Sequence, residues 1–89
     1  MQAEMKKDPD ATLDYGFDWA QWLAGDVIIS SQWYVPARFL TVSAAYDDTT
    51  TLIWLSGGRG LEEVVVTNRI TTRDGRQEER SFKILVGDR

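Results

Sequence analysis

The chain has 89 residues and a net charge of −4, and it contains neither cysteine nor histidine. This length fits a single domain near the lower size limit for one hydrophobic core. Disulfides and thiolate metal sites are excluded, and the commonest metal ligand and general base is missing. Carboxylates alone could still bind a metal or transfer protons. We therefore predict a protein that is not an enzyme, without catalytic, cofactor-binding or metal-binding residues.

Charge and hydropathy limit the partners. Residues 1–58 carry three positive and eight negative side chains, so the first two-thirds of the chain is acidic and nucleic acid is not an expected partner. No apolar run approaches the length of a membrane span, and the first residues lack the apolar segment of an export signal. We expect a protein that is made in a cytoplasm and does not contact a membrane.

The first predicted element is a mobile or partner-ordered lead. Residues 1–11 mix charges with a proline and show no apolar periodicity, which predicts a flexible segment before a single domain at 12–89. Lys6 and Lys7 lie in this lead. They are candidates for partner binding, and the simpler interpretation is a solvated tail.

A strand and one helical turn are predicted next. Aromatic residues at alternate positions indicate a half-buried strand, and these are Tyr15, Phe17 and Trp19. Asp18 and Gln21 have the spacing of a capping box, and Gly25 suits the position that ends a helical turn.

Three further strands follow. In residues 26–35 the apolar residues at odd positions predict an inward face made by Val27, Ile29, Trp33 and Val35, and Pro36 ends the strand. Residues 39–46 and 49–55 form the next two predicted strands, with a turn at Asp47 and Asp48. The glycine-rich residues 56–60 are a predicted loop between strands. It is not expected to bind phosphate, because it lacks the lysine and the following helix of a phosphate-binding loop.

The last third is a predicted hairpin whose register follows from its apolar faces. A three-residue loop at 73–75 pairs Thr72 with Arg76 and brings Val66 opposite Phe82, so both apolar faces point to one core. This register predicts a left-handed Gly75. The tip, residues 68–80, is polar on both faces apart from Ile70, and we expect it to extend beyond the core.

Four arginines gather at this tip, and they are Arg69, Arg73, Arg76 and Arg80. Arginine is enriched at protein interfaces, where it pairs in a bidentate manner. Two interpretations stay open: docking to another subunit, or a solvated loop whose charge is balanced by Glu78 and Glu79.

The chain has four tryptophans, which can build a core or a binding surface. Trp19 and Trp33 are expected to point inward, whereas Trp22 and Trp54 could form an aromatic platform for sugar. A small immunoglobulin-like carbohydrate-binding module is therefore an alternative function. Asp26, Asp47 and Asp48 lack the regular spacing of a calcium site, so turn formation is the expected role of the paired aspartates.

Short strands and glycine-marked turns predict an all-β fold, an antiparallel immunoglobulin-like β-sandwich with one short helical turn. Read together, several segments resemble the fiber-tail adaptor proteins of tailed bacteriophages. The matching segments are Asp8-Pro9-Asp10, Leu13-Asp14-Tyr15, Asp18-Trp19, Trp22-Leu23, Gly25-Asp26, Trp54-Leu55-Ser56-Gly57-Gly58, residues 66–72, Asp74-Gly75-Arg76 and Glu79-Arg80-Ser81-Phe82.

The resemblance implies a structural virion protein that attaches tail fibers or spikes to the tail. It also implies several copies in a ring, with phage tail and fiber proteins as partners. The family offers no catalytic motif. On this basis the expected contacts are made by the lead and the hairpin tip, through Lys6, Lys7, Arg69, Arg73, Arg76 and Arg80.

Overall fold

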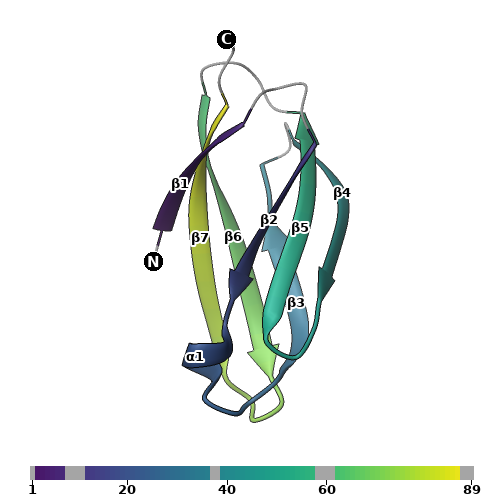
Figure 1. Ribbon diagram of the computed structural model, residues 1–89, viewed down its shortest axis with the longest axis vertical. Helices are drawn as coiled ribbons and strands as arrows, with labels where there is room; N and C mark the ends of the chain where they lie inside the picture. The colour runs from purple at the N-terminus through teal and green to yellow at the C-terminus, as the bar shows by residue number, and fades with distance from the viewer. Residues whose placement is uncertain (1, 8–11, 37–38, 58–61, 87–89) are drawn as a thin grey trace.

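The computed structural model describes residues 2–7, 12–36, 39–57 and 62–86, with the side chains of 12–36, 43–57 and 63–85. Along the chain the elements are β1 (Gln2–Lys7), β2 (Leu13–Asp18), α1 (Ala20–Leu23), β3 (Ile28–Tyr34), β4 (Phe39–Tyr46), β5 (Thr50–Gly57), β6 (Glu62–Thr72) and β7 (Gln77–Val86). Figure 1 shows them as an elongated body with α1 at one end.

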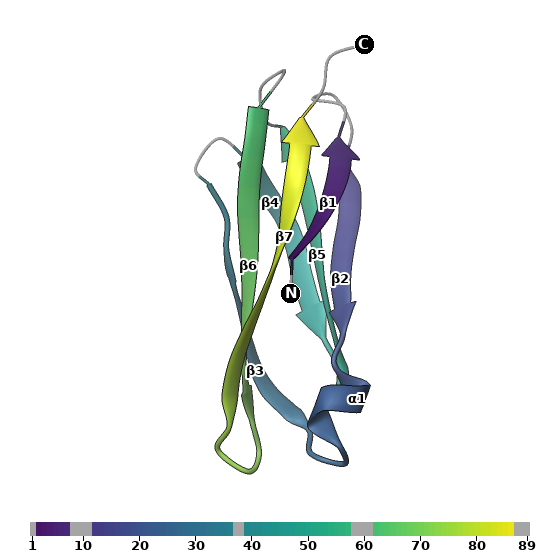
Figure 2. The same ribbon diagram turned by 90° about the vertical axis from the view of Figure 1, so that its left-hand side faces the viewer.

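Two sheets pack face to face. The large sheet has the strand order β1-β7-β6-β3, and the small sheet has the order β2-β5-β4. Figure 2 looks onto the large sheet, with β6, β7 and β1 in front and the strands of the small sheet behind them. Every pairing is antiparallel except that of β1 with β7, which is parallel. The predicted fold class, an all-β immunoglobulin-like sandwich with one short helical turn, is confirmed.

The N-terminal segment contains a strand that the sequence pattern does not predict. Gln2–Lys7 form β1 and pair in register with Ser81–Val86 of β7. A strand forms here without apolar alternation, because an edge strand can be held by backbone hydrogen bonds alone. The sequence pattern therefore does not identify β1, which lies within the segment expected to be a flexible lead.

The turn at α1 differs in detail from the predicted capping box. Trp19 takes the N-cap position, and the carboxylate of Asp18 accepts a hydrogen bond from the Ala20 amide at 3.0 Å rather than one from Gln21. Gly25 has a φ of 97°, as expected of the residue that ends the turn.

A bulge in β3 changes the face on which its apolar residues lie. Ile28 pairs with Thr72 and Ser30 with Thr71, so Ile29 is the extra residue. Ile28 is consequently buried and Ile29 is 54% exposed. The predicted inward position of Ile29 is wrong, because a bulge reverses the alternation that a regular strand would keep. Trp33 and Val35, which follow the bulge, do pack against the core.

The register of the β6–β7 hairpin is confirmed. Val66 pairs with Phe82 and Val64 with Ile84. The Thr72 amide donates to the Arg76 carbonyl at 2.9 Å, and Gly75 is left-handed with a φ of 87°. The three-residue loop is the one that keeps both apolar faces inward.

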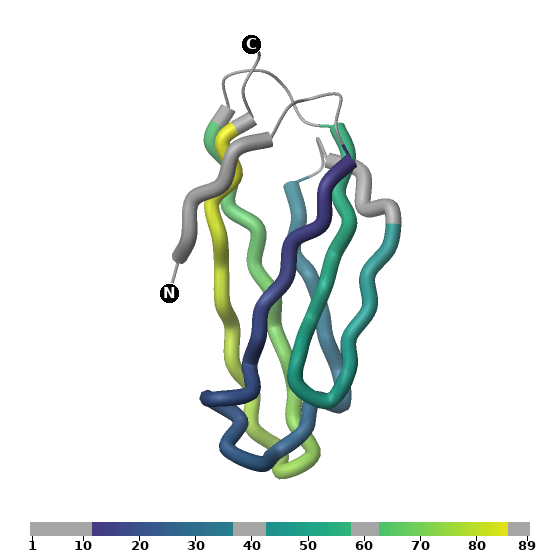
Figure 3. Tube along the Cα trace, viewed as in Figure 1, coloured from purple at the N-terminus to yellow at the C-terminus, as the bar shows by residue number. Residues whose placement is uncertain are grey.

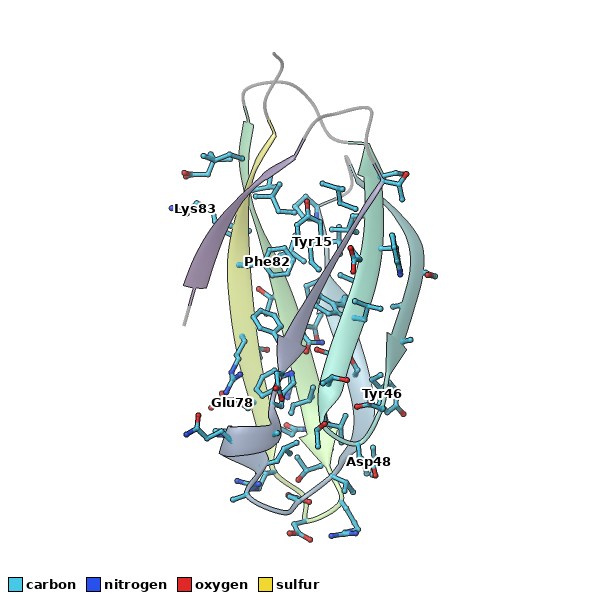
Figure 4. The ribbon with its side chains drawn as sticks, in the orientation of Figure 1. Tyr15, Tyr46, Asp48, Glu78, Phe82 and Lys83 are labelled. Carbon is cyan, nitrogen blue, oxygen red and sulfur yellow. The ribbon has the colours of Figure 1, made fainter. Side chains whose placement is uncertain are left out.

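The core is divided into two clusters of buried side chains. The central cluster lies between the sheets and consists of Tyr15, Ile53, Leu55, Val64, Val66, Phe82 and Ile84. Tyr15 and Phe82 stack across the sandwich with ring centroids 5.0 Å apart (Figure 4). The end cluster lies under α1 and consists of Trp19, Leu23, Ile28 and Ile70.

The hairpin tip is part of the end cluster. Asn68, Ile70 and Thr72 are all buried. Figure 3 shows the turn between β6 and β7 beside the chain that enters and leaves α1. The expectation that the tip extends beyond the core is therefore wrong. Asn68 makes the inner face of the tip look polar in the sequence because its partners lie far away along the chain, and these are Trp19, Ser31, Gln32 and Thr51.

Gly16 marks a close approach between β2 and β5. A Cβ at this position would collide with the carbonyl oxygen of Thr51, which is backbone and cannot turn away. We expect Gly16→Ala to lower the free energy of unfolding by about 1–3 kcal/mol, measured by denaturant titration. Asp14→Ala, on the same exposed face of β2, is the control and should change it by less than about 0.5 kcal/mol. Equal unfolding midpoints for Gly16→Ala and wild type would contradict this.

Candidate docking surfaces

The structure separates the four tip arginines into two pairs. Arg76 faces the chain around α1: its Nε donates to the Asp26 carboxylate at 3.2 Å and its Nη2 to the Leu23 carbonyl at 2.8 Å. Its guanidinium lies 4.2 Å from the centre of the Trp22 ring. Arg76 therefore binds its own fold at three points.

Arg80, four residues after Arg76 and within β7, acts in the same way. Its guanidinium lies 4.2 Å from the Trp19 ring centre, and its Nη1 donates to the Asp18 carbonyl at 3.1 Å. Cation–π contacts of this kind stabilise when the ring and the cation are partly removed from water. Together Arg76 and Arg80 fasten α1 to the hairpin.

Asp26 is the acidic centre of this arrangement. Its side chain is buried, and it accepts hydrogen bonds from the amides of Val27 at 2.8 Å and Asp74 at 3.3 Å. Burial by itself raises the pKa of Asp26, but hydrogen bonds from Thr72, Val27, Arg76 and Asp74 outweigh burial and lower the pKa to about 2. The carboxylate is thus charged at every ordinary pH.

This lowered pKa predicts how stability depends on pH. Asp26 binds a proton less readily in the folded than in the unfolded chain, so its contribution is complete above the unfolded pKa of 3.8 and is lost as the pH falls through about 2. We expect Asp26→Asn to unfold more easily at pH 7 and to lose less stability than wild type between pH 4 and pH 2. Thermal melting at both pH values measures the difference, and parallel pH profiles would contradict it.

Arg69 and Arg73 lie apart from that network. On the outer face of the large sheet, Arg69 donates to Gln77 at 2.7 Å and lies 3.9 Å from a Glu79 oxygen. Arg73 is at the turn, with its side chain 62% exposed and its Nε 3.9 Å from Asp74. Exposed pairs of this kind contribute little to stability. Exposure does not separate Arg69 from Arg76, since their side chains are 39% and 42% exposed. Arg69 and Arg73 are the better docking candidates because the side-chain partners described for them lie within the hairpin and not around α1.

The two lysines lie at the other end of the molecule. Lys6 and Lys7 are the last residues of β1 and pair with Leu85 and Val86, whereas Arg73 follows the opposite end of the hairpin. The longest extent of the molecule is 44 Å. The six predicted partner-binding residues therefore do not form one site.

Residues 7–85 match a protein family described as the podophage GP4 fiber-tail adaptor protein gp77. The chain belongs to this family. The resemblance deduced from the sequence is thereby confirmed over nearly the whole chain. Membership implies a structural component of the phage tail that interacts with tail and fiber proteins. No curated protein matches the chain.

The two tryptophans considered for sugar binding do not make a common platform. One face of Trp22 is covered by Arg76, and the ring packs against the end cluster. Trp54 is 38% exposed and pairs with Asp14 in the small sheet, four residues before the end of β2. The gp77-family chain therefore presents one exposed tryptophan on this sheet, and not the pair of rings that the alternative function invoked.

Two of the three aspartates considered for calcium, Asp26 and Asp47, have other partners. The carboxylate of Asp47 accepts hydrogen bonds from the amides of Thr49 and Thr50 and from the Thr50 hydroxyl. Among the described residues, no three acidic side chains gather where they could hold a metal ion. The helix that the described ranges contain is too short and too polar to cross a membrane.

One surface has no distinctive motif in the sequence. Ser43–Tyr46 of β4 are all exposed, although they lie in a regular strand. The sequence feature that marks this surface is the lack of any charged residue over Phe39–Tyr46. Neither arginines nor aromatic pairs indicate it. Exposure on both faces could not be deduced without knowing that β4 is an edge strand.

Proposed function

We propose that this gp77-family chain attaches tail fibers or spikes to the tail of a tailed phage. It does so as a rigid spacer in several copies around a ring, and not as an enzyme. It is made in the cytoplasm of the host bacterium and enters the virion without contact with nucleic acid or membrane. The observation that carries the proposal is the family match over residues 7–85.

The two ends of the sandwich have different roles in this proposal. The N-terminal end of the chain, with Lys6 and Lys7 at the end of β1, contacts the tail. The β6–β7 turn contacts a neighbouring protein through Arg69 and Arg73. The 44 Å length of the molecule supports a bridge between two partners rather than a single compact contact.

Arg76 and Arg80 contribute indirectly. Because both bind α1 and its flanks, they hold the hairpin in the position from which Arg69 and Arg73 reach a partner. Reversal of the charge of Arg76 would place a carboxylate beside Asp26 and test the fold rather than the docking. The docking test must therefore use an arginine that the fold does not need.

Arg73→Glu is the variant for this test. We expect it to leave the melting temperature of the isolated chain within a few degrees of wild type, since a surface substitution changes stability by about 0.5 kcal/mol or less. Phage carrying it are expected to bind fewer fibers per particle, counted by negative-stain electron microscopy and quantitative mass spectrometry.

The matched control is Lys83→Glu, which makes the same charge change on the outer face of the large sheet, where Lys83 lies 3.5 Å from Glu63. The control particles should keep their fibers. A normal number of fibers on Arg73→Glu particles would show that the hairpin turn is not a contact. Particles that lack the wild-type chain altogether would refute the adaptor function.

A further inference from the structure

β4 is an edge strand, and the part of it whose side chains the structure describes, Ser43–Tyr46, is exposed on both faces. It pairs with β5 and, among the described residues, with no other strand. Its four residues Ser43–Tyr46 are all exposed, and Tyr46 is 47% exposed at the end of the strand (Figure 4). The ladder is irregular between Thr41 and Ser43. The regular part of the free edge therefore runs from Ser43 to the turn.

The other edges of the sandwich differ from β4. β1 and β2 carry charged residues along their length, which discourages pairing with a further strand. β3, like β4, has no charged residue, but backbone groups at the start of β3 already bond to the end of β4 and to the turn after it. Its Ile29 carbonyl accepts from the Tyr46 hydroxyl at 2.8 Å, and its Ile28 amide donates to the Asp48 carbonyl at 3.0 Å. β4 has no charged residue, and its contact with β3 uses the Tyr46 side chain and not the backbone groups of Ala44 or Tyr46.

The backbone groups that point outward can be identified from the turn. The Asp47 amide donates to the Thr50 carbonyl at 3.0 Å, so these two residues form a hydrogen-bonded pair. Because such pairs alternate in an antiparallel ladder, Ala45 and Ser43 bond to β5, and the amides and carbonyls of Ala44 and Tyr46 point to the free edge. These are the groups that an added strand would use.

The small sheet is acidic. Its strands and the turn after β4 carry four exposed aspartates, which are Asp14, Asp18, Asp47 and Asp48, and no lysine or arginine. Two copies of the chain joined at this edge would bring two acidic sheets together, each in a chain of net charge −4. Like charges across an interface are costly, whereas a basic partner would be attracted. The charge therefore favours a different protein over a second copy.

We propose that β4 accepts an extended segment of a tail or fiber protein as an additional strand of the small sheet. The segment has at least one lysine or arginine where it passes the aspartates of the turn. Main-chain hydrogen bonds to Ala44 and Tyr46 supply the pairing, and the exposed Trp54 lies on the adjoining strand for side-chain contact. This inference rests on the proposed function, because it takes its partner from the phage tail.

The test uses proline at two neighbouring positions. Ala44→Pro removes an amide that points to the free edge, so the ladder with β5 keeps its bonds and the isolated chain should melt close to wild type. Ala45→Pro removes an amide that bonds β5 and should destabilise the chain, which checks the assigned alternation. Ala44→Lys keeps the amide but adds a positive charge that opposes both strand pairing and a basic partner.

Each chain is supplied from a plasmid to phage that lack the gene, and the copies per purified particle are measured by quantitative mass spectrometry. We expect both Ala44 variants to be reduced about tenfold relative to wild type, equivalent to about 1.4 kcal/mol. If Ala44→Pro fails to fold, Ala44→Lys decides the question alone.

Three outcomes would overturn the inference. Wild-type levels of the folded Ala44 variants in particles would show that the edge is not used, while the adaptor function would stand. Absence of the wild-type chain from particles would refute both. Self-association of the isolated wild-type chain that Ala44→Pro abolishes, measured by light scattering, would assign the edge to a second copy.

Discussion

Trp19→Ala is expected to lower the free energy of unfolding by about 3–5 kcal/mol, the typical cost of removing a fully buried tryptophan. Trp19 is 0% exposed and occupies the centre of the end cluster with Leu23, Ile28 and Ile70. Its ring meets Phe17 and Trp22 edge to face, with centroids 6.0 and 5.7 Å away. A domain of this size is stable by roughly 5–15 kcal/mol, so the loss would be a large part of the total.

The effect should extend to the helical turn. Arg80 would lose the ring above which it lies, and the end cluster under α1 would lose its largest side chain. Urea titration followed by circular dichroism measures the loss. Trp54→Ala is the matched control, because that side chain is partly exposed on the small sheet and outside both clusters. Similar losses for the two variants would show that burial of Trp19 in the end cluster contributes no more to the free energy of unfolding than the partly exposed Trp54 does.

The parts of the fold that the sequence predicts are those governed by local rules. The β6–β7 register follows from alternation in two strands and one left-handed glycine. The boundaries of β4 at Phe39–Tyr46 follow from a proline before the strand and two aspartates after it. In each case a few neighbouring residues are enough to predict the feature, and no contact between distant segments is needed.

The parts that the sequence does not predict depend on contacts between distant segments. Asn68 looks like a polar residue of an exposed tip, but its amide donates to the Ser31 hydroxyl and the Gln32 carbonyl at 3.0 Å each. Arg76 is separated from Asp26 by fifty residues. No spacing rule detects such pairs, so an arginine that holds the fold together and one that is free for docking look alike in the sequence.

This difference changes the candidate site. Composition alone gives equal weight to the four tip arginines. The structure pairs Arg69 and Arg73 with residues of the hairpin itself, and it uses Arg76 and Arg80 to fasten α1. Assembly defects caused by substitution of Arg76 or Arg80 would therefore report misfolding of the tip as much as lost docking, and only substitutions at Arg69 or Arg73 can separate these effects.

Asn68→Leu is expected to be strongly destabilising although it adds an apolar residue of similar size to a buried position. Asn68 is 0% exposed, and its Oδ1 accepts from Thr51 Oγ1 at 2.8 Å and from Trp19 Nε1 at 3.2 Å. Leucine would leave these donors and the Gln32 carbonyl with fewer partners inside the sandwich. Each buried polar group left unsatisfied costs about 1–3 kcal/mol, so we expect a total loss of about 2–5 kcal/mol.

The comparison residue for this prediction is Val65, which lies three positions earlier in β6 and is 45% exposed. Val65→Leu should change the free energy of unfolding by less than about 0.5 kcal/mol, since it alters a surface side chain only. Equal or greater stability of Asn68→Leu would mean that hydrophobic gain outweighs the lost hydrogen bonds, and the polar network would then have no stabilising role.

Combining Asn68→Leu with Trp19→Phe tests whether the two side chains act together. Phenylalanine keeps most of the buried ring but removes the Nε1 donor that bonds Asn68 and, at 3.2 Å, Thr51 Oγ1. Once the donor is gone, loss of the Asn68 acceptor leaves one fewer group unsatisfied. We therefore expect the double variant to lose less stability than the sum of the single losses, by about 0.5–3 kcal/mol. Additive losses would show that the Trp19–Asn68 bond contributes nothing and that α1 is held by packing and by its two arginines.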